Sequence, residues 1–469
     1  MRSFCLARRI ERKRLVELQK NQRHKGLVED LTSKGSGVVK LDGFPIFIEG
    51  TIPGETVQFK LTKVGKKFGY GRLEDVIEPS ADRVTLTDPI GRQIGTMTLQ
   101  HMAYPAQLNY KQKQVKEAFE RLGGFKNIAV QPTIGMEHPW SYRNKAQIPV
   151  RQVKGQLETG FYRRNSHDLV PVENFHIQDP VIDETIIVVR DILRRYQIKP
   201  YDEASGKGTI RHIIVKRGHY TGEVMLVLVL NQRELPHEAE IVAEIKAGVP
   251  ELVSLMANFN FKQTNVILGK ENRVLWGQDY YTDEMLGMQF KISANSFYQV
   301  NTPQAERMYE EAIRLAQLTG QETVLDAYCG IGSISLGLAR EAGQVYAMEV
   351  VPEAIEMAKD NAKVNEITNV HFEVGKAEDV LPRWQAEGIQ FDVAVVDPPR
   401  KGLDKSFIDT LVELAPERIV YVSCNPATQA RDCQHFAEAG YQLQYIQPVD
   451  LFPQSPHVEC VVLLQRSNG

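Results

Sequence analysis

Cysteine is scarce in this chain, and no two cysteines form a C-x-x-C pair. The 469 residues contain five cysteines, at positions 5, 329, 424, 433 and 460. Such sparse thiols argue against a disulfide framework and indicate a reducing, cytoplasmic compartment. Long apolar runs are also missing, both for a membrane span and for the apolar core of an amino-terminal signal peptide. The sequence therefore predicts a cytoplasmic protein without a membrane partner.

A large excess of charge of either sign is absent overall, but the charges are unevenly placed. The formal net charge is −3, whereas residues 1–79 contain 16 Lys/Arg against 10 Asp/Glu, and residues 1–25 contain nine against two. A basic arm of this kind often contacts the phosphates of nucleic acid. A solvated helix start or a misassigned start codon accounts for residues 1–19 equally well, so the role of the arm stays open.

Three patterns follow the basic arm and predict a multidomain α/β protein. Residues 20–78 contain short alternating strands separated by glycine and proline, as in a small OB-like β-barrel. Residues 79–285 mix helix and strand patterns and predict an α+β middle domain. Its first helix, 100–122, is expected to pack on the carboxyl-terminal domain. From 286 to 469 strands alternate with helices, which is typical of a Rossmann-like, doubly wound parallel sheet.

Basic and aromatic residues are interleaved at three places in the first two domains. The segment from Lys63 to Arg72, read as a loop, contains Phe68 and Tyr70 among lysines and glycines. Such a surface suits an RNA strand, whose bases stack on aromatic rings while cations follow its phosphates. Alternatively, the two rings face the barrel core. Tyr142-Arg143-Asn144-Lys145 and Phe161-Tyr162-Arg163-Arg164 repeat the pattern in the middle domain.

The carboxyl-terminal domain begins with a nucleotide-type glycine turn. Asp326-Ala327-Tyr328-Cys329-Gly330-Ile331-Gly332 follows the first predicted strand but lacks the third glycine of the dinucleotide fingerprint. Glu349 ends the second strand, where a carboxylate accepts hydrogen bonds from ribose hydroxyls. These features predict an adenosine ligand without distinguishing a dinucleotide from S-adenosylmethionine.

The ends of two later strands favour the methyl donor. Asp397-Pro398-Pro399-Arg400 follows one of them, and Ser423-Cys424-Asn425-Pro426 follows the next. A dehydrogenase has no use for either turn, whereas a methyltransferase uses the first where donor and acceptor meet. Cys424 would present its thiol at the edge of a parallel sheet where α/β enzymes bind their ligands.

In combination, these motifs resemble the TRAM-domain RNA (uracil-5-)-methyltransferases over nearly the whole chain beyond residue 20. The other matching elements are the barrel and, in chain order, Leu99-Gln100-His101, Tyr142-Arg143-Asn144-Lys145, Phe297-Tyr298-Gln299-Val300-Asn301 and His457-Val458-Glu459. The resemblance implies a fold with an amino-terminal TRAM barrel and a carboxyl-terminal S-adenosylmethionine-dependent methyltransferase domain. It implies donor binding by Gln299, Tyr328, Glu349 and Asp397. It also implies that Cys424 is the nucleophile and Glu459 the base.

The chain departs from many family members at the positions of an iron–sulfur cluster. Where those members carry four cysteines, this chain has Asp88, Ile94, Met97 and Phe175. None of these side chains supplies a thiolate to iron, so we expect neither a cluster nor another metal. Family members without a cluster, with which the chain is compared, include enzymes of Gram-positive bacteria that modify 23S ribosomal RNA.

The resemblance implies methylation at C5 of uridine through a covalent adduct. The Cys424 thiolate would add to C6, and Glu459 would remove the C5 proton after methyl transfer. The site must either lower the thiol pKa or deprotonate the thiol as the substrate binds, and the sequence leaves both routes open. Asp397 is assigned to the donor, although contact with the base is an alternative. Cys329, Cys433 and Cys460 are expected to be structural.

The expected partner is RNA, with 23S rRNA as the leading substrate and a monomeric enzyme that does not act on DNA. The closest alternative is transfer RNA modified by the same chemistry. Cytosine-5 methylation is disfavoured because those enzymes commonly carry a Pro-Cys nucleophile elsewhere. Amino-group methylation is disfavoured because Arg400, rather than an aromatic residue, follows Asp-Pro-Pro. A non-catalytic RNA-binding or folding factor is the alternative from another class.

Overall fold

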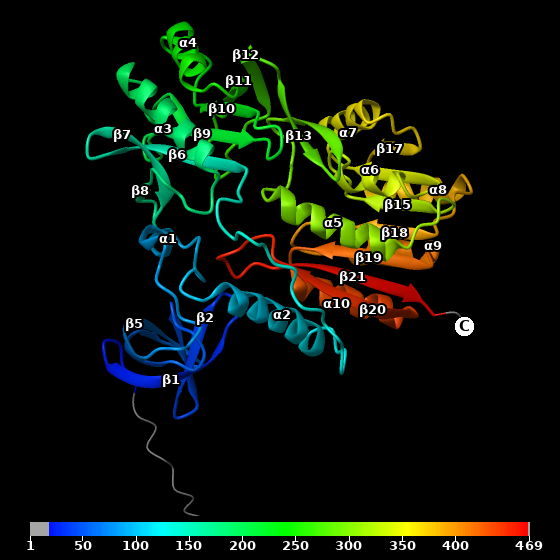
Figure 1. Ribbon diagram of the computed structural model, residues 1–469, viewed down its shortest axis with the longest axis horizontal. Helices are drawn as coiled ribbons and strands as arrows, with labels where there is room; N and C mark the ends of the chain where they lie inside the picture. The colour runs from blue at the N-terminus through cyan, green and yellow to red at the C-terminus, as the bar shows by residue number, and fades with distance from the viewer. Residues whose placement is uncertain (1–17, 468–469) are drawn as a thin grey trace, which may run out of the picture. The chain divides into compact units, whose positions relative to one another are not determined.

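The computed structural model describes residues 18–467, which are drawn in colour in Figure 1. Residues 1–17 of the predicted basic arm and Cys5 lie outside the described residues. The chain divides into two compact units. One ends at Leu86 and also includes Thr98–Ala106, and the other contains Thr87–Met97 and the chain from Gln107 onward. Within 18–467, no helix combines the length and the apolar character that crossing a membrane requires.

The first unit contains a small closed β-barrel. Its strands are β1 (Arg23–Leu31), β2 (Ser36–Leu41), β3 (Phe44–Glu49), β4 (Thr56–Val64) and β5 (Gly69–Glu78), in the order β1-β2-β3-β5-β4. Alternate side chains point inward, so that Ile46, Ile48, Val57 and Phe59 are fully buried. Closure satisfies the backbone groups that an open sheet would leave unpaired at its edges.

The aromatic segment of the barrel is mostly strand rather than the predicted loop. Only a short turn separates the end of β4 from the start of β5 at Gly69. The side chains of Phe68 and Tyr70 are 41% and 43% exposed and therefore lie outside the core. Gly71 takes the inward position, where a Cβ atom would approach Phe59 to 2.8 Å.

The second unit begins with a seven-stranded mixed sheet, in the order β12-β11-β10-β9-β6-β7-β8. Its strands are β6 (Lys145–Val153), β7 (Gln156–Tyr162), β8 (Leu169–Pro171), β9 (Ile210–Arg217), β10 (Val224–Leu230), β11 (Leu252–Phe259) and β12 (Glu271–Gly277). Helices α3 (Pro180–Arg195) and α4 (Glu238–Gly248) cover one face through a shared apolar core. We call these elements the middle sheet.

A second seven-stranded sheet follows, in the order β17-β16-β15-β18-β19-β21-β20. Its strands are β15 (Thr323–Ala327), β16 (Gln344–Glu349), β17 (Val370–Val374), β18 (Val393–Val396), β19 (Arg418–Ser423), β20 (Tyr441–Val449) and β21 (Glu459–Arg466). The first five strands in the sheet are parallel, as predicted. The sheet departs from the prediction at β21, which runs antiparallel between β19 and β20. We call this the carboxyl-terminal sheet.

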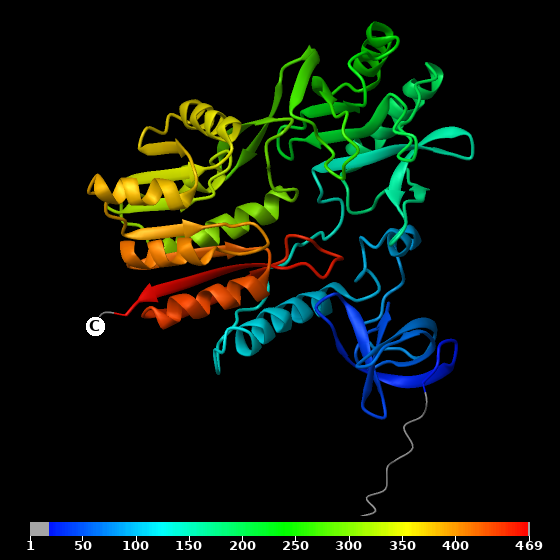
Figure 2. The ribbon, with the colours of Figure 1, turned by 180° about the vertical axis from the view of Figure 1, so that it is seen from behind.

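Helices cover both faces of the carboxyl-terminal sheet (Figures 1 and 2). The helices are α5 (Thr302–Ala316), α6 (Ser333–Ala339) and α7 (Pro352–Val364) on one face, and α8 (Ala377–Ala386), α9 (Lys405–Leu414) and α10 (Pro426–Glu438) on the other. Helix α2 (Tyr104–Arg121) adds Val115 and Phe119 to the second face. The hairpin of β13 (Tyr280–Met285) and β14 (Met288–Ser293) joins α5 and the middle sheet in one continuous core.

Candidate active site

The order of the carboxyl-terminal sheet gathers the predicted site residues along one edge. Tyr328, Asp397 and Cys424 follow the parallel strands β15, β18 and β19, and Glu349 ends β16. Because β21 runs antiparallel to β19, its first residue, Glu459, lies at the same edge. The pairing of Ser423 with Cys460 then sets Cys424 next to Glu459 in the register of the two strands. This proximity depends on the inserted strand that the sequence pattern did not reveal.

Cys424 lies in a turn that is hydrogen-bonded on both sides. Asn425 caps α10 by accepting the Ala427 N–H at 3.2 Å, and its Nδ2 donates to the Arg400 carbonyl at 3.0 Å. Thr428 Oγ1 donates to the same carbonyl at 3.3 Å. These bonds join the Asp-Pro-Pro-Arg turn to the cysteine turn, so both loops hold the thiol in place. Of the cysteines that the structure describes, Cys424 alone is not buried.

Two carboxyl groups with raised pKa values lie close to the thiol. Burial and the nearby carboxylate of Asp397 raise the pKa of Glu459 to about 8. Burial raises the pKa of Asp397 itself to about 7. For Cys424, burial and the charges of Glu459 and Asp397 raise the thiol pKa to about 11, and Arg400 opposes this increase. The thiol of the free protein is therefore protonated at neutral pH, which favours deprotonation upon substrate binding over a permanently ionised nucleophile.

The glycine turn after β15 forms a backbone cradle. Tyr328 has a positive φ of 72°, and the N–H groups of Tyr328 and Cys329 both donate to the Met348 carbonyl, at 3.1 and 3.0 Å. This conformation is uncommon for a residue with a side chain. A Cβ atom on Gly330 would meet nothing within 4 Å, so space lies open above the turn. The Tyr328 ring packs against Phe407, with 5.8 Å between centroids.

Backbone groups hold one carboxylate oxygen of Glu349. Its Oε1 accepts the Val350 N–H at 2.7 Å and the Val351 N–H at 3.1 Å, which leaves Oε2 to accept hydroxyl groups. The exposed side chains of Val350 and Val351 lie directly beside it in the chain and offer apolar contact for a planar ring. A carboxylate next to exposed valines suits an adenosine group, with the ribose on Glu349.

Gln299 reaches the site from the segment between β14 and α5. Asn144, directly before β6, donates from Nδ2 to the Gln299 carbonyl and to Thr302 Oγ1, both at 2.9 Å. Asn144 therefore positions this segment. Tyr309 of α5, which the sequence did not single out, is buried, and its hydroxyl group interacts with the side chain of Gln299. Burial and the charges of Asp397 and Glu459 raise the pKa of Tyr309. Its place in an amphipathic helix made it resemble an ordinary core residue.

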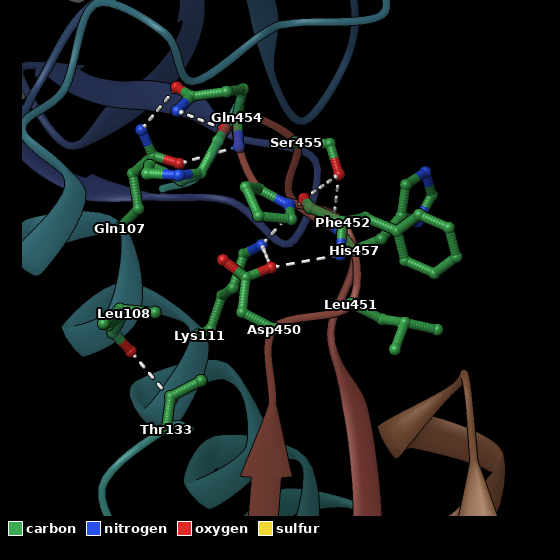
Figure 3. A network of polar contacts seen from close by, with 12 residues as sticks. Gln107, Leu108, Lys111, Thr133, Asp450, Leu451, Phe452, Gln454, Ser455 and His457 are labelled. Atoms are coloured by element: carbon green, nitrogen blue, oxygen red, sulfur yellow. Dashed lines mark hydrogen bonds and ion pairs between the residues drawn. The ribbon is translucent and has the colours of Figure 1, made fainter. Parts of the chain in front are cut away.

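A buried polar network fixes the loop that leads to Glu459 (Figure 3). Lys111 of α2 and Asp450 form an ion pair in which both side chains are fully buried. Lys111 also donates to the Phe452 carbonyl at 3.1 Å. Gln107 and Gln454 exchange two hydrogen bonds, of 2.9 and 3.0 Å. Helix α2 thereby holds the residues between β20 and the proposed base.

The four residues at the family's cluster positions have other structural roles. Ile94, Met97 and Phe175 belong to one apolar cluster that also contains Tyr142. Asp88 caps α1 (Pro89–Ile94), accepting the Ile90 N–H at 2.8 Å, and its Oδ2 lies 3.1 Å from His176 Nδ1. In the described range 18–467, no group of three His, Cys, Asp or Glu residues is arranged to hold a metal ion.

Comparisons with known proteins match the barrel and the rest of the chain to known families. The sequence pattern of the family tRNA (Uracil-5-)-methyltransferase matches residues 103–467, and that of the TRAM domain matches residues 25–73. An uncharacterized RNA methyltransferase of Enterococcus faecalis is 51% identical, over 93% of this chain and 96% of its own. One of Halalkalibacterium halodurans is 47% identical, over 97% of this chain and 100% of its own.

A solved structure shares the fold of nearly the whole chain. It is the Pyrococcus abyssi tRNA (uracil-54, C5)-methyltransferase in complex with S-adenosyl-L-homocysteine, with a TM-score of 0.76 and 26% sequence identity. The match covers 94% of this chain and 100% of that one. With a TRAM barrel at its start and a methyltransferase fold at its end, the chain is an RNA methyltransferase that belongs to the tRNA (uracil-5-)-methyltransferase family.

Proposed function

We propose that the protein transfers a methyl group from S-adenosylmethionine to C5 of a uridine in 23S rRNA, with Cys424 as nucleophile and Glu459 as base. The observation that carries the proposal is the meeting of Cys424, Asp397 and Glu459 at one sheet edge beside the glycine turn. This arrangement suits an acceptor that must be activated by covalent addition, because C5 of uracil alone is a weak nucleophile.

The residues of the glycine turn and its neighbours fit the methyl donor. Glu349 Oε2 would accept the ribose hydroxyls, and Tyr328 and Gln299 would border the rest of the molecule. Asp397, with its carboxyl group near both Glu459 and Cys424, would face the reacting centre. When bound, S-adenosylmethionine supplies an electrophilic methyl group on a positively charged sulfur.

The protein's own groups carry the other steps. As donor and uridine bind, the Cys424 thiol releases its proton to solvent. The resulting thiolate forms a bond to C6 of the uracil, and the electron pair of the 5,6 double bond moves toward C5 and O4. C5 takes the methyl group, and the C5 proton then passes to the Glu459 carboxylate. The C6–Sγ bond breaks, the double bond re-forms, and the thiolate is regenerated.

The barrel provides a surface on which RNA bases can stack. The rings of Phe47, Phe68 and Tyr70 contact one another, with centroid distances of 5.4 to 5.9 Å. Lys66 and Lys67 are exposed directly beside Phe68 in the chain. Aromatic rings among cations bind single-stranded nucleic acid by stacking and by phosphate contacts. A cytoplasmic monomer acting on RNA rather than DNA is part of this proposal.

Transfer RNA is the second candidate substrate, because the Pyrococcus abyssi enzyme named above modifies tRNA. The favoured target, 23S rRNA, follows from the similarity to family members of Gram-positive bacteria that lack the cluster cysteines. Mapping 5-methyluridine in both RNAs, from cells with and without this protein, tests the choice. Loss confined to tRNA would overturn the rRNA assignment and leave the chemistry in place.

Two variants test the mechanism on RNA that contains the mapped uridine. Cys424→Ala should lose methyl transfer and form no adduct, whereas Glu459→Gln should accumulate a protein–RNA adduct that survives denaturing electrophoresis. Cys433→Ala, which removes a fully buried thiol of α10, is the matched control. Full methyl transfer by Cys424→Ala would refute covalent catalysis. Normal turnover by Glu459→Gln without an adduct would remove Glu459 as the base.

A further inference from the structure

Three cationic side chains meet at the start of the middle sheet without a carboxylate partner. Arg143 lies two residues before Lys145, the first residue of β6, and Lys145 pairs directly with Lys216 of β9. Residues directly opposite in antiparallel strands point to the same face, with Cβ atoms about 5 Å apart. In the described part of the chain, none of the three forms an ion pair with an acidic side chain.

The cations repel one another in a partly buried place. Lys216 is 3% exposed, and burial together with the charge of Lys145 lowers its pKa to about 7. Burial and the charge of Arg143 lower the pKa of Lys145 as well. Lys216 Nζ donates to the carbonyls of Ser293 and Ser296, at 2.9 and 3.1 Å, so its hydrogen bonds neutralise no charge. Like charges held together at a cost in stability create a place where an anion is attracted.

The cluster adjoins the proposed active site. Asn144, between Arg143 and Lys145, holds the Gln299 segment by the hydrogen bonds described above. On the other side, burial lowers the pKa of His457, which lies two residues before Glu459 in the chain, and the charges of Arg400, Lys111 and Arg143 lower it further. His457 and Arg400 are exposed, and Arg143 and Lys145 are half-buried. A line of cations therefore extends from the middle sheet toward the catalytic thiol.

We propose that Arg143 and Lys145, supported by the buried charge of Lys216, bind a backbone phosphate of the RNA beside the uridine to be methylated. This inference rests on the function proposed above. A base that has left its stack is held in the active site partly through its backbone. Two adjacent cations can bind a backbone phosphate whatever the RNA sequence. The carboxylate of the methyl donor is the other candidate oxyanion, and the experiments below distinguish the two.

The protein side of the test compares Arg143→Gln and Lys145→Gln with Lys199→Gln. Lys199 is an exposed lysine of the same domain that forms no ion pair among the described residues. With the full-length chain, each site variant should raise the KM for the RNA about tenfold, as expected for the loss of a charged hydrogen bond. The KM for S-adenosylmethionine should be unchanged. In a Cys424→Ala background, the slope of log Kd against log salt should become smaller by about 0.7 to 0.9 per lost contact.

The RNA side of the test needs no change in the protein. A neutral methylphosphonate replaces one phosphate at a time next to the target uridine. At the bound phosphate, it should weaken binding to the wild-type chain about tenfold and leave binding to the Arg143→Gln/Lys145→Gln double variant nearly unchanged. Equal losses in both proteins at every position would overturn the phosphate assignment. If the variants raise the KM for S-adenosylmethionine and leave the KM for RNA unchanged, the cations bind the donor carboxylate and the proposal is refuted.

A failure of the inference can be told apart from a failure of the proposed function. If the wild-type chain forms no 5-methyluridine and no adduct, the proposed function itself is wrong. If the wild-type chain methylates and the variants keep the wild-type KM for RNA and the wild-type salt slope, only the phosphate site is wrong. Thermal unfolding and S-adenosylmethionine binding of each variant check that the fold is intact.

Discussion

Replacing Glu459 by Gln should stabilise the protein while it damages the proposed chemistry. Glu459 is 5% exposed, and its pKa is raised by burial and by the charge of Asp397 from 4.5 to about 8. In this pH window the folded protein holds a proton that the unfolded chain has released. The free energy of unfolding therefore falls by about 1.4 kcal/mol per pH unit as the pH rises through the window.

The magnitude follows from the two pKa values. The contribution of protonated Glu459 to the free energy of unfolding is fully present below pH 4.5. It is lost as the pH rises through the folded pKa of about 8. By pH 7 the loss reaches about 3 kcal/mol, and above pH 8 it levels off at about 4 to 5 kcal/mol. The pKa values of Asp397 and Asp326 are raised from 3.8 to about 7. Their ionisation also lowers the free energy of unfolding as the pH rises, over a lower pH range than that of Glu459. Glu459→Gln cannot ionise and removes one of these three contributions.

Urea unfolding at pH 5, 7 and 8.5, followed by tryptophan fluorescence and circular dichroism, measures the effect. The variant should resemble wild type at pH 5 and exceed its stability by about 3 kcal/mol at pH 8.5, after allowing for the cost of burying an amide. Glu438→Gln, an exposed residue of α10, removes the same charge without burial and should leave the pH dependence unchanged. If wild type and Glu459→Gln lose equal stability between pH 5 and 8.5, the burial argument for the base is refuted.

Three further predictions address the loop, the donor and the barrel. Lys111→Met should lower the free energy of unfolding, measured in urea, by about 3 to 5 kcal/mol because it leaves Asp450 buried without the Lys111 cation. The double variant Lys111→Met/Asp450→Leu should recover part of this loss. Equal stability of the single and double variants would contradict the argument. Glu349→Gln should weaken S-adenosylmethionine binding about tenfold in calorimetry, since a charged acceptor is lost, and unchanged affinity would exclude the ribose contact. Phe68→Ala should lower RNA affinity by about 1 to 3 kcal/mol without changing the barrel's stability, because the ring lies outside the core; equal binding in a filter assay would refute a stacking role.

Local patterns predicted the parallel part of the carboxyl-terminal sheet well. Glu349 ends β16 and Asp397 directly follows β18, as predicted. Strands buried on both faces read as continuous apolar runs, and helices between them show their own period, so both are visible in one sequence. The insertion of β21 between β19 and β20 is different, because nothing local to 459–466 encodes its neighbours.

In the candidate site, too, residues marked by a local pattern could be predicted, whereas contacts between distant parts of the chain could not. The residue types at Cys424, Asp397 and Glu349 were visible because each follows or ends a strong strand signal. The support from Lys111 and Asp450 was not visible, since 339 positions separate these two residues in the chain. The direct pairing of Lys145 with Lys216 also depends on strand register, which the sequence pattern of either strand leaves undetermined.

The reactivity of Cys424 shows why the chemistry needed the fold. The sequence left open whether the site lowers the thiol pKa or deprotonates the thiol as the substrate binds. The choice depends in part on Glu459 and Asp397, which reach the site from other strands. Burial, together with the charges of Glu459 and Asp397, raises the thiol pKa to about 11, and Arg400 opposes this increase. A ligand that brings a positively charged sulfur to this edge would offset the same carboxylates and lower the pKa of both the thiol and the base. The geometry thus favours a nucleophile that stays protonated in the free protein and ionises when donor and uridine are both in place.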